Sequence, residues 1–186
     1  MVRKASTSSS LDGNVSHTSK RKGSTVAENL LDELFRKRDE WRQSMAAAVH
    51  LVKGSELSWE WNQQGKMKWY LHPALMDRAI RSLMVYIQEI PPLSNTGKQK
   101  HQGGLVHYIL EGRGFTVMNG KKHDWEEGDC VILPTLPEGV EYQHFNTDPD
   151  KPVRFIAAQA NLFEALGVDM GAGFEQLEDA PGNANK

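Results

Sequence analysis

The side chains most able to do chemistry in this 186-residue chain are three of its seven histidines. His101, His107 and His144 lie in a region punctuated by glycines, and the first two stand close together in the sequence. Clustered imidazoles that leave coordination positions open suit Fe, Zn, Cu or Ni, so the pattern favours a transition-metal site. A satisfied structural histidine is the alternative in each case, and it is the better interpretation for His17, His50, His72 and His123.

Other reactive patterns are weak. The only cysteine, Cys130, lies in the apolar run CVIL, which favours an inert core thiol. A single cysteine also excludes an internal disulfide and a cysteine-cluster zinc site. The glycines around Gly103 are not followed by the Lys-Ser/Thr pair of a phosphate-binding loop, and no serine stands in a nucleophile elbow. The sequence therefore predicts neither a phosphate loop nor a serine or cysteine nucleophile.

Short β-forming segments must position the histidines. From residue 55 onward, aromatic and β-branched runs recur about every ten residues between Gly, Pro and Asn-Gly, which is typical of an antiparallel sandwich or barrel. Asn119-Gly120 is the strongest hairpin signal, because both positions of a two-residue turn need positive φ. The predicted strands are 57–61, 66–71, 83–90, 105–110, 115–118, 121–125, 130–133, 140–145 and 153–159.

An amphipathic helix is predicted over 25–53, ahead of the strands. Thr25 and Glu28 have the spacing of a capping box, and apolar residues then recur at three- and four-residue steps up to Gly54. Its polar face mixes acids and bases, so the apolar stripe is expected to pack on the protein or on a partner subunit and not on a membrane. After the strands, 162–166 is expected to form one short helical turn, and the last ten residues are expected to fray.

Composition and charge restrict the class of protein. Hydrophobic residues make up 39% of the chain and charged residues 25%, which is typical of one folded domain, and no apolar run could span a bilayer. The polar start does not resemble a secretory signal, so a cytoplasmic location is expected. Residues 1–24 are basic and rich in serine, and they are expected to be a disordered tail. No aromatic residue is interleaved with the charges of this tail, which argues against nucleic-acid binding.

Three segments carry a resemblance to a known family, namely KQKHQGGLVHYILEGRG (98–114), NGKKHDWEEGDCVILP (119–134) and PEGVEYQHFN (137–146). They resemble the two signatures of the cupin superfamily, in particular single-domain cupins related to gentisate-type ring-cleaving dioxygenases. The matching positions are Gly112 of the first signature and Gly128, Pro134, Pro137, Gly139 and Asn146 of the second. The resemblance implies an all-β fold, a cupin antiparallel β-barrel (jelly roll) over 54–186, with the N-terminal amphipathic α-helix before it.

The resemblance also implies a divalent metal inside the barrel, held by two histidines and a glutamate of the first signature and a histidine of the second. Carried over position by position, these places fall on Gln99, His101, Leu105 and Tyr142. Only one standard ligand is therefore retained. Residues two apart on a strand face the same side, so His107 is expected on the side of Leu105. His144 is likewise expected on the side of Tyr142. A replacement set of His101, His107 and His144 then predicts one ion, Fe(II) first, with Zn, Mn, Ni or Cu as alternatives.

The leading hypothesis is a metal-dependent cupin enzyme, a non-haem iron dioxygenase acting on a phenolic or other oxygenated small molecule. Tyr142 and Gln99 would orient or protonate the bound intermediate. Substrate contacts are expected from Tyr86, Arg81, Lys100 and Phe155, with a cation holding a carboxylate or phenolate. The alternative is a cupin that has lost its metal ligands and serves as a small-molecule binding or regulatory module. A homodimer is expected, since cupins commonly pair through their sheets.

Overall fold

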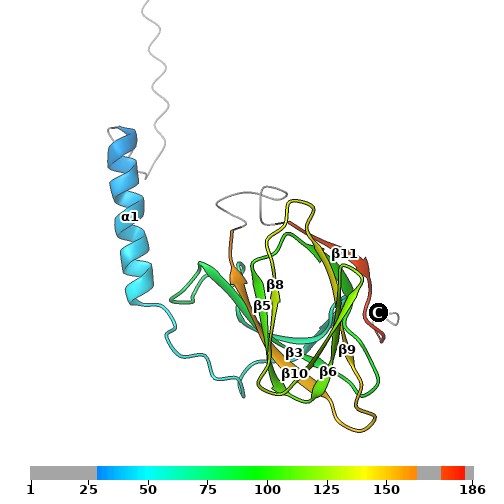
Figure 1. The fold of residues 1–186 in the computed structure, drawn as a ribbon. Helices are drawn as coiled ribbons and strands as arrows, with labels where there is room; N and C mark the ends of the chain where they lie inside the picture. Colours follow the sequence, from blue (N-terminus) through cyan, green and yellow to red (C-terminus); the bar gives the residue numbers. More distant parts are fainter. Residues whose placement is uncertain (1–28, 163–172, 183–186) are drawn as a thin grey trace, which may run out of the picture. The chain divides into compact units, whose positions relative to one another are not determined.

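A computed structural model describes residues 29–162 and 173–182 of the chain, which divides into two compact units, 1–40 and 41–186. The described residues form a single helix, α1 (Leu30–Ala46), followed by eleven strands (Figure 1). The strands are β1 (Glu60–Asn62), β2 (Gly65–Leu71), β3 (Leu83–Ile90), β4 (Lys98–His101), β5 (Leu105–Glu111), β6 (Arg113–Met118), β7 (Lys121–Glu126), β8 (Cys130–Leu133), β9 (Val140–Asn146), β10 (Val153–Ala160) and β11 (Phe174–Glu178).

The strands form two antiparallel sheets that face each other as a barrel (Figure 1). One sheet has the order β1-β2-β3-β10-β5-β8, and the other has the order β11-β4-β9-β6-β7. Most neighbours in these sheets are not consecutive in sequence, so the chain crosses repeatedly between the sheets. This is the jelly-roll arrangement of the predicted all-β class.

Alternation along the strands fills the interior of the barrel. On β5, Leu105, His107 and Ile109 are buried while the residues between them are exposed, and on β9 Tyr142 and His144 are buried in the same alternating way. The inward orientation predicted for both histidines is therefore confirmed. Apolar side chains from both sheets pack around them, among them Met67, Ile90, Trp125, Leu133, Val140, Val153 and Phe155.

The hairpin predicted at Asn119-Gly120 joins β6 to β7. Asn119 has a φ of 45° and Gly120 a φ of 76°, and Met118 pairs with Lys121 across the turn. Both turn residues thus adopt the left-handed conformation that this two-residue connection requires. The tight turn sets the register of the β6–β7 pair, and β6 in turn pairs with β9, where Thr116 lies opposite His144.

Two strands were not predicted, and both border the functional region. The segment KQKH forms β4, which pairs with β9 on one side and with β11 on the other. β11 overlaps the end that was expected to fray, and Ala180 beyond it is buried. Neither segment shows a clear alternation of apolar and polar residues, because pairing with strands distant in sequence holds them in place. The helical turn expected over 162–166 falls, after Leu162, outside the described residues.

The helix is shorter than predicted. Asn29 caps its start, because its Oδ1 accepts hydrogen bonds from the backbone N–H groups of Leu31 and Asp32, each at 3.0 Å. The proposed capping box of Thr25 and Glu28 lies outside the described residues. The helix ends at Ala46 and not at residue 53, since Val49 leaves the helical path to form a bridge with Arg78. No helix among the described residues is long and apolar enough to cross a membrane.

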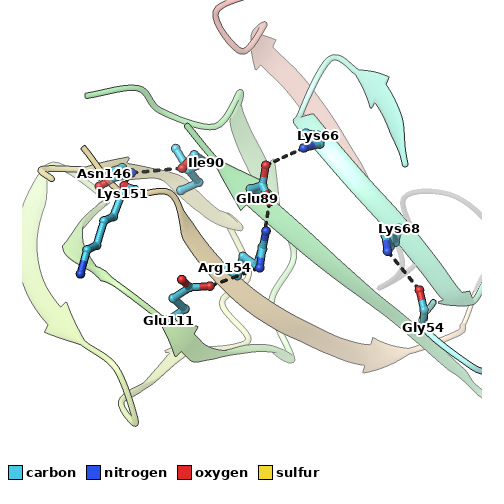
Figure 2. Close-up of polar contacts among 9 residues, drawn as sticks. All are labelled: Gly54, Lys66, Lys68, Glu89, Ile90, Glu111, Asn146, Lys151 and Arg154. Atoms are coloured by element: carbon cyan, nitrogen blue, oxygen red, sulfur yellow. Dashed lines mark hydrogen bonds and ion pairs between the residues drawn. The ribbon is translucent and has the colours of Figure 1, made fainter. Parts of the chain in front are cut away.

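Hydrogen bonds and ion pairs connect the strands at one end of the six-stranded sheet (Figure 2). Glu89 accepts hydrogen bonds from Lys66 Nζ at 2.6 Å and from Arg154 Nε at 2.8 Å, which ties β3 to β2 and β10. Burial alone raises the pKa of Glu89, but the bonds from these two cations outweigh it and bring the pKa below its ordinary value. Asn146, a signature residue, donates from Nδ2 to the carbonyls of Ile90, Pro91 and Lys151 at 2.8 to 3.1 Å. These contacts fix the strand ends that frame the interior.

Candidate functional site

A cavity of about 200 Å³ lies inside the barrel and is lined by residues of both sheets. Its wall combines three kinds of side chain. Apolar contacts come from Met67, Trp69, Met84, Leu105 and Phe174. Carboxamides come from Asn62, Gln63, Gln64, Gln99, Gln159 and Gln176. The remaining lining residues are Tyr86, His101 and Tyr142. The cavity is therefore rich in neutral hydrogen-bonding groups.

A hydrogen-bond network orders a portion of this wall. Tyr142 Oη donates to Gln99 Oε1 at 2.8 Å, and Gln99 Nε2 donates to Gln176 Oε1 at 3.2 Å. Gln176 Oε1 also accepts from Gln64 Nε2 at 2.8 Å. The hydroxyl of Tyr86 interacts with that of Tyr142. The structure thus brings together Gln99, Tyr142 and Tyr86, three of the residues to which the sequence assigned catalytic or substrate-binding roles.

Both tyrosines in the wall stay protonated at neutral pH. Burial raises the pKa of Tyr86 and raises the pKa of Tyr142 well above its ordinary value. A buried phenol that is not ionised is a hydrogen-bond donor and acceptor, and it is not a base at pH 7. Tyr142 and Gln99 are consequently equipped to orient a bound molecule through neutral hydrogen bonds.

His107 and His144 form a buried pair behind the cavity wall. Their ring centroids are 4.5 Å apart with the rings at 78°, and the two side chains are 1% and 0% exposed. Phe155 packs against both rings, with centroid distances of 5.0 Å and 4.9 Å. Burial lowers the pKa of His144 to about 3 and lowers the pKa of His107 well below its ordinary value. Both imidazoles are therefore neutral at pH 7.

Each ring of this pair has one nitrogen without a hydrogen-bond partner. His144 Nδ1 shares a 2.6 Å hydrogen bond with Thr116 Oγ1, which also accepts one from Trp125 Nε1 at 2.8 Å. His144 Nε2 and His107 Nδ1 are buried and unpaired within the described portion of the chain. A buried nitrogen without a protein partner is either a cost of packing or a position that binds a water molecule, an ion or a ligand.

His101 lines the cavity, which His107 and His144 do not, although its imidazole is near enough to His107 to contribute to the lowering of the His107 pKa. Its Nδ1 accepts a hydrogen bond from the backbone N–H of Gly103 at 2.9 Å, so the neutral ring carries its proton on Nε2. A ring held in this way has no free lone pair for a metal ion. Among the residues that the structure describes, no group of three His, Cys, Asp or Glu side chains is arranged to hold one. The described residues thus do not fit the metal site that the resemblance implies.

The other substrate-binding residues expected from the sequence lie outside the cavity wall. Lys100 borders a second depression of about 190 Å³, which shares His101 and Phe174 with the cavity, and Arg81 contacts Met76 Sδ through its guanidinium at 2.9 Å. Phe155 belongs to the core and has no exposed surface. The cations expected to hold a carboxylate are therefore not among the described residues of the cavity wall.

Several wall residues were not anticipated from the sequence. Gln159 follows the alternation of Phe155 and Ala157 on a predicted strand, so an inward orientation could have been inferred. Gln176 belongs to a strand that no apolar pattern marks, and Gln64 lies in a turn. No sequence signal was available for these two, since pairing between distant strands places them.

The comparisons with known proteins agree with this architecture. A family model described as a cupin domain matches residues 86–158. The 5-aminosalicylate 1,2-dioxygenase of Comamonas sp. is 26% identical over 113 residues, which is 61% of this chain and 28% of that enzyme. The alignment therefore spans less than a third of the length of this relative.

Solved structures share the fold. The polyketide cyclase RemF from Streptomyces resistomycificus matches with a TM-score of 0.50 and 16% identity, over 60% of this chain and 79% of RemF. Vicilin from Corylus avellana (hazelnut) matches with a TM-score of 0.51 and 16% identity, over 68% of this chain and 36% of vicilin. Likeness at this identity concerns architecture alone. The resemblance to cupins seen in the sequence is confirmed for residues 86–158, which match the cupin domain model.

Proposed function

We propose that this cupin domain binds a small organic molecule in the cavity between its sheets, without a metal ion. The observation that carries the proposal is the cavity wall, where Tyr86, Tyr142 and six carboxamides surround a space of about 200 Å³. An apolar cavity of about 150 Å³ accommodates benzene, so this volume suits one substituted ring. Apolar side chains together with a few oriented polar groups are the usual composition of a ligand pocket.

Filling the cavity is expected to abolish binding. Compounds with one ring that raise the melting temperature of EDTA-treated protein should lose this effect in Met84→Trp, because Met84 lines the cavity. The matched control is Val85→Trp, whose side chain lies on the opposite face of the same strand, and it should retain the shift. Thermal unfolding and calorimetric titration measure the effect. Equal shifts in both variants would refute the proposed binding place.

The second candidate function is the metal-dependent dioxygenase that acts on a phenolic substrate. It is favoured by the dioxygenase relative and by the unpaired nitrogens of His107 and His144. Such a site would draw on His101, His107 and His144 for Fe(II), Zn, Mn, Ni or Cu, with Gln99 and Tyr142 close to the bound substrate. It would require His101 to leave its hydrogen bond with Gly103.

Metal analysis separates the two candidates. Protein purified without chelator is expected to hold less than about 0.1 ion per chain, unchanged after incubation with Fe(II), Mn(II) or Zn(II), because three free ligands are not assembled. Elemental analysis by mass spectrometry gives the ratio. A content near one ion per chain that is lost in His107→Ala and kept in His123→Ala would establish the metal-dependent candidate instead.

The proposed protein partner is a second copy of this chain, on the outer face of β5 and β8. Val106, Tyr108 and Leu110 project outward from β5, and Ile132 of β8 lies opposite Val106 and is 64% exposed. These four side chains carry no charge, so the strip that they form is complementary to itself under a twofold axis.

A charge in the centre of this strip is expected to prevent association. Ile132→Glu should halve the molar mass of the assembly measured by light scattering, because burying the new carboxylate without a partner is costly. The control is Leu93→Glu at a 71% exposed site away from the strip, which should leave the mass unchanged. A monomeric wild-type protein would contradict the proposed pairing.

A further inference from the structure

We infer that the ligand of the barrel cavity is uncharged and presents a hydrogen-bond donor and acceptor side by side, as a primary carboxamide or a lactam does. This inference rests on the proposed binding function and specifies its ligand class. It concerns the group on the ligand that meets His101 and Gln159, two residues that line the same cavity.

The cavity wall offers a ligand no charged partner among its described residues. None of the described lining residues is Lys, Arg, Asp or Glu. His101 is the histidine of this wall, and its Nδ1 accepts a hydrogen bond from the backbone N–H of Gly103, as only the neutral ring can. A carboxylate placed in this space would lose its hydration without gaining a cation, which is strongly unfavourable. The cavity thus selects against the carboxylated aromatics that the sequence resemblance suggests.

Several polar groups of the wall already hydrogen-bond to each other within the protein. Gln99 accepts from Tyr142 and donates to Gln176, and both oxygen and nitrogen of the Gln176 amide are engaged. Gln64 donates to the same Gln176 oxygen. These amides shape the cavity and leave few free positions for a ligand.

A buried acceptor on Gln159 and a neighbouring donor on His101 are open to a ligand in this wall. Gln159 Oε1 is buried and has no hydrogen-bond partner among the residues that the structure describes, while its Nε2 contacts only the sulfur of Met84, at 3.3 Å. The side chain of Gln159 lies close enough to His101 to raise the pKa of the imidazole, but no hydrogen bond of normal geometry joins the two, and Gln159 Oε1 stays unpaired. With Nδ1 engaged by Gly103, the His101 ring presents Nε2–H as a donor. An acceptor and a donor therefore lie next to each other in the wall. An amide N–H on the ligand would satisfy Gln159 Oε1, and its carbonyl would accept from His101.

Three probes of similar shape test charge and donor separately: benzamide, methyl benzoate and benzoate. Benzamide is expected to bind at least about tenfold more tightly than benzoate at pH 7.5, because the anion is excluded and one otherwise unpaired acceptor is satisfied. Methyl benzoate, which is uncharged and has no donor, should lie between them. Ligand-observed NMR titration on EDTA-treated full-length protein measures these weak affinities.

The variant Gln159→Leu removes the unpaired acceptor and keeps the cavity apolar. It should bring benzamide down to the affinity of methyl benzoate and leave methyl benzoate unchanged, whereas Gln43→Leu on the exposed surface of α1 should change neither. Binding of benzoate as tight as that of benzamide, or a benzamide affinity that Gln159→Leu does not alter, would overturn the inference while leaving cavity binding in place. Failure of all three probes would also overturn it, and the wider screen with Met84→Trp then decides on the binding function itself.

Discussion

Acidification from pH 6.5 to pH 5 is expected to destabilise the barrel steeply, because folding buries His107 and His144 in the neutral form. Burial lowers the pKa of His144 to about 3 and that of His107 well below its ordinary value, whereas both titrate normally in the unfolded chain, near 6.5. Below that pH the unfolded chain binds one more proton per histidine than the folded chain. Each such proton lowers the free energy of unfolding by up to about 1.4 kcal/mol per pH unit.

These lowered pKa values determine the direction of the change in stability and the pH range in which it occurs. The stabilisation is complete above the unfolded pKa of about 6.5 and is lost as the pH falls toward the folded values. The two residues together approach a slope of about 3 kcal/mol per pH unit near pH 5. The carboxyl of Glu89, whose pKa is lowered, acts in the same direction only at lower pH, as it passes below the ordinary value for a glutamate. Above pH 5, the pH dependence of the free energy of unfolding therefore reports mainly on the histidines.

Urea unfolding at pH 5 to 7.5 in the presence of EDTA measures this slope. His144→Gln should reduce it by between a third and a half, because one uncompensated proton is then absent from the unfolded chain while His107 and His101, whose pKa burial also lowers, still contribute. The matched control is His123→Gln at an exposed position of β7, which should keep the full slope. A wild-type free energy of unfolding that is flat between pH 6.5 and pH 5 would contradict the buried neutral pair.

The substitution Phe155→Ala is expected to lower the free energy of unfolding by about 3 to 5 kcal/mol, the range for a buried aromatic ring. Phe155 is 0% exposed, and its ring packs against His107 at 87° and against His144 at 57°. Its removal would leave a void beside two imidazoles, each of which has a nitrogen without a partner among the described residues. Collapse around such polar groups recovers little of the lost contact, so the cost should lie toward the upper end.

The neighbouring residue on the same strand provides the control. Ile156 projects to the outer face of β10, and Ile156→Ala should cost about 1 kcal/mol or less. Chemical denaturation at pH 7.5 compares the two variants, with the m-value confirming that the extent of unfolding is unchanged. A contact with substrate, the role expected from the sequence, would instead weaken ligand binding and leave stability nearly intact. That result would support the substrate-binding role of Phe155 that the sequence predicts.

The proposed function, ligand binding through neutral groups, differs from that of a metal-centred cupin. The carboxamide-lined wall and the hydrogen-bonded ring of His101 both point to recognition by shape and hydrogen bonding. The buried pair of His107 and His144 then contributes to packing and to the pH dependence of stability. The two roles can be measured separately, because ligand binding responds to Gln159 and unfolding responds to His144.

Local patterns in the sequence determined the fold class and the side of each strand that faces inward. The hairpin at Asn119-Gly120, the boundaries of β3 and β8 and the inward orientation of His107 and His144 all follow from interactions between near neighbours, namely turn conformation and strand alternation. The segments around Gly112 and Asn146, which resemble the cupin signatures, predicted the cupin fold. These features need no knowledge of which strands pair.

Only the tertiary structure decided where the inward-facing residues lie along the barrel. Alternation gives the side of a strand but not the depth, so it could not show that His101 lines the cavity while His107 and His144 pack behind Tyr142. The pairing of β4 with β9 and β11 joins segments that are far apart in the sequence. No local pattern of apolar residues predicts this pairing. The cavity wall depends on these pairings, because its carboxamides come from strands and turns that meet only in the folded chain.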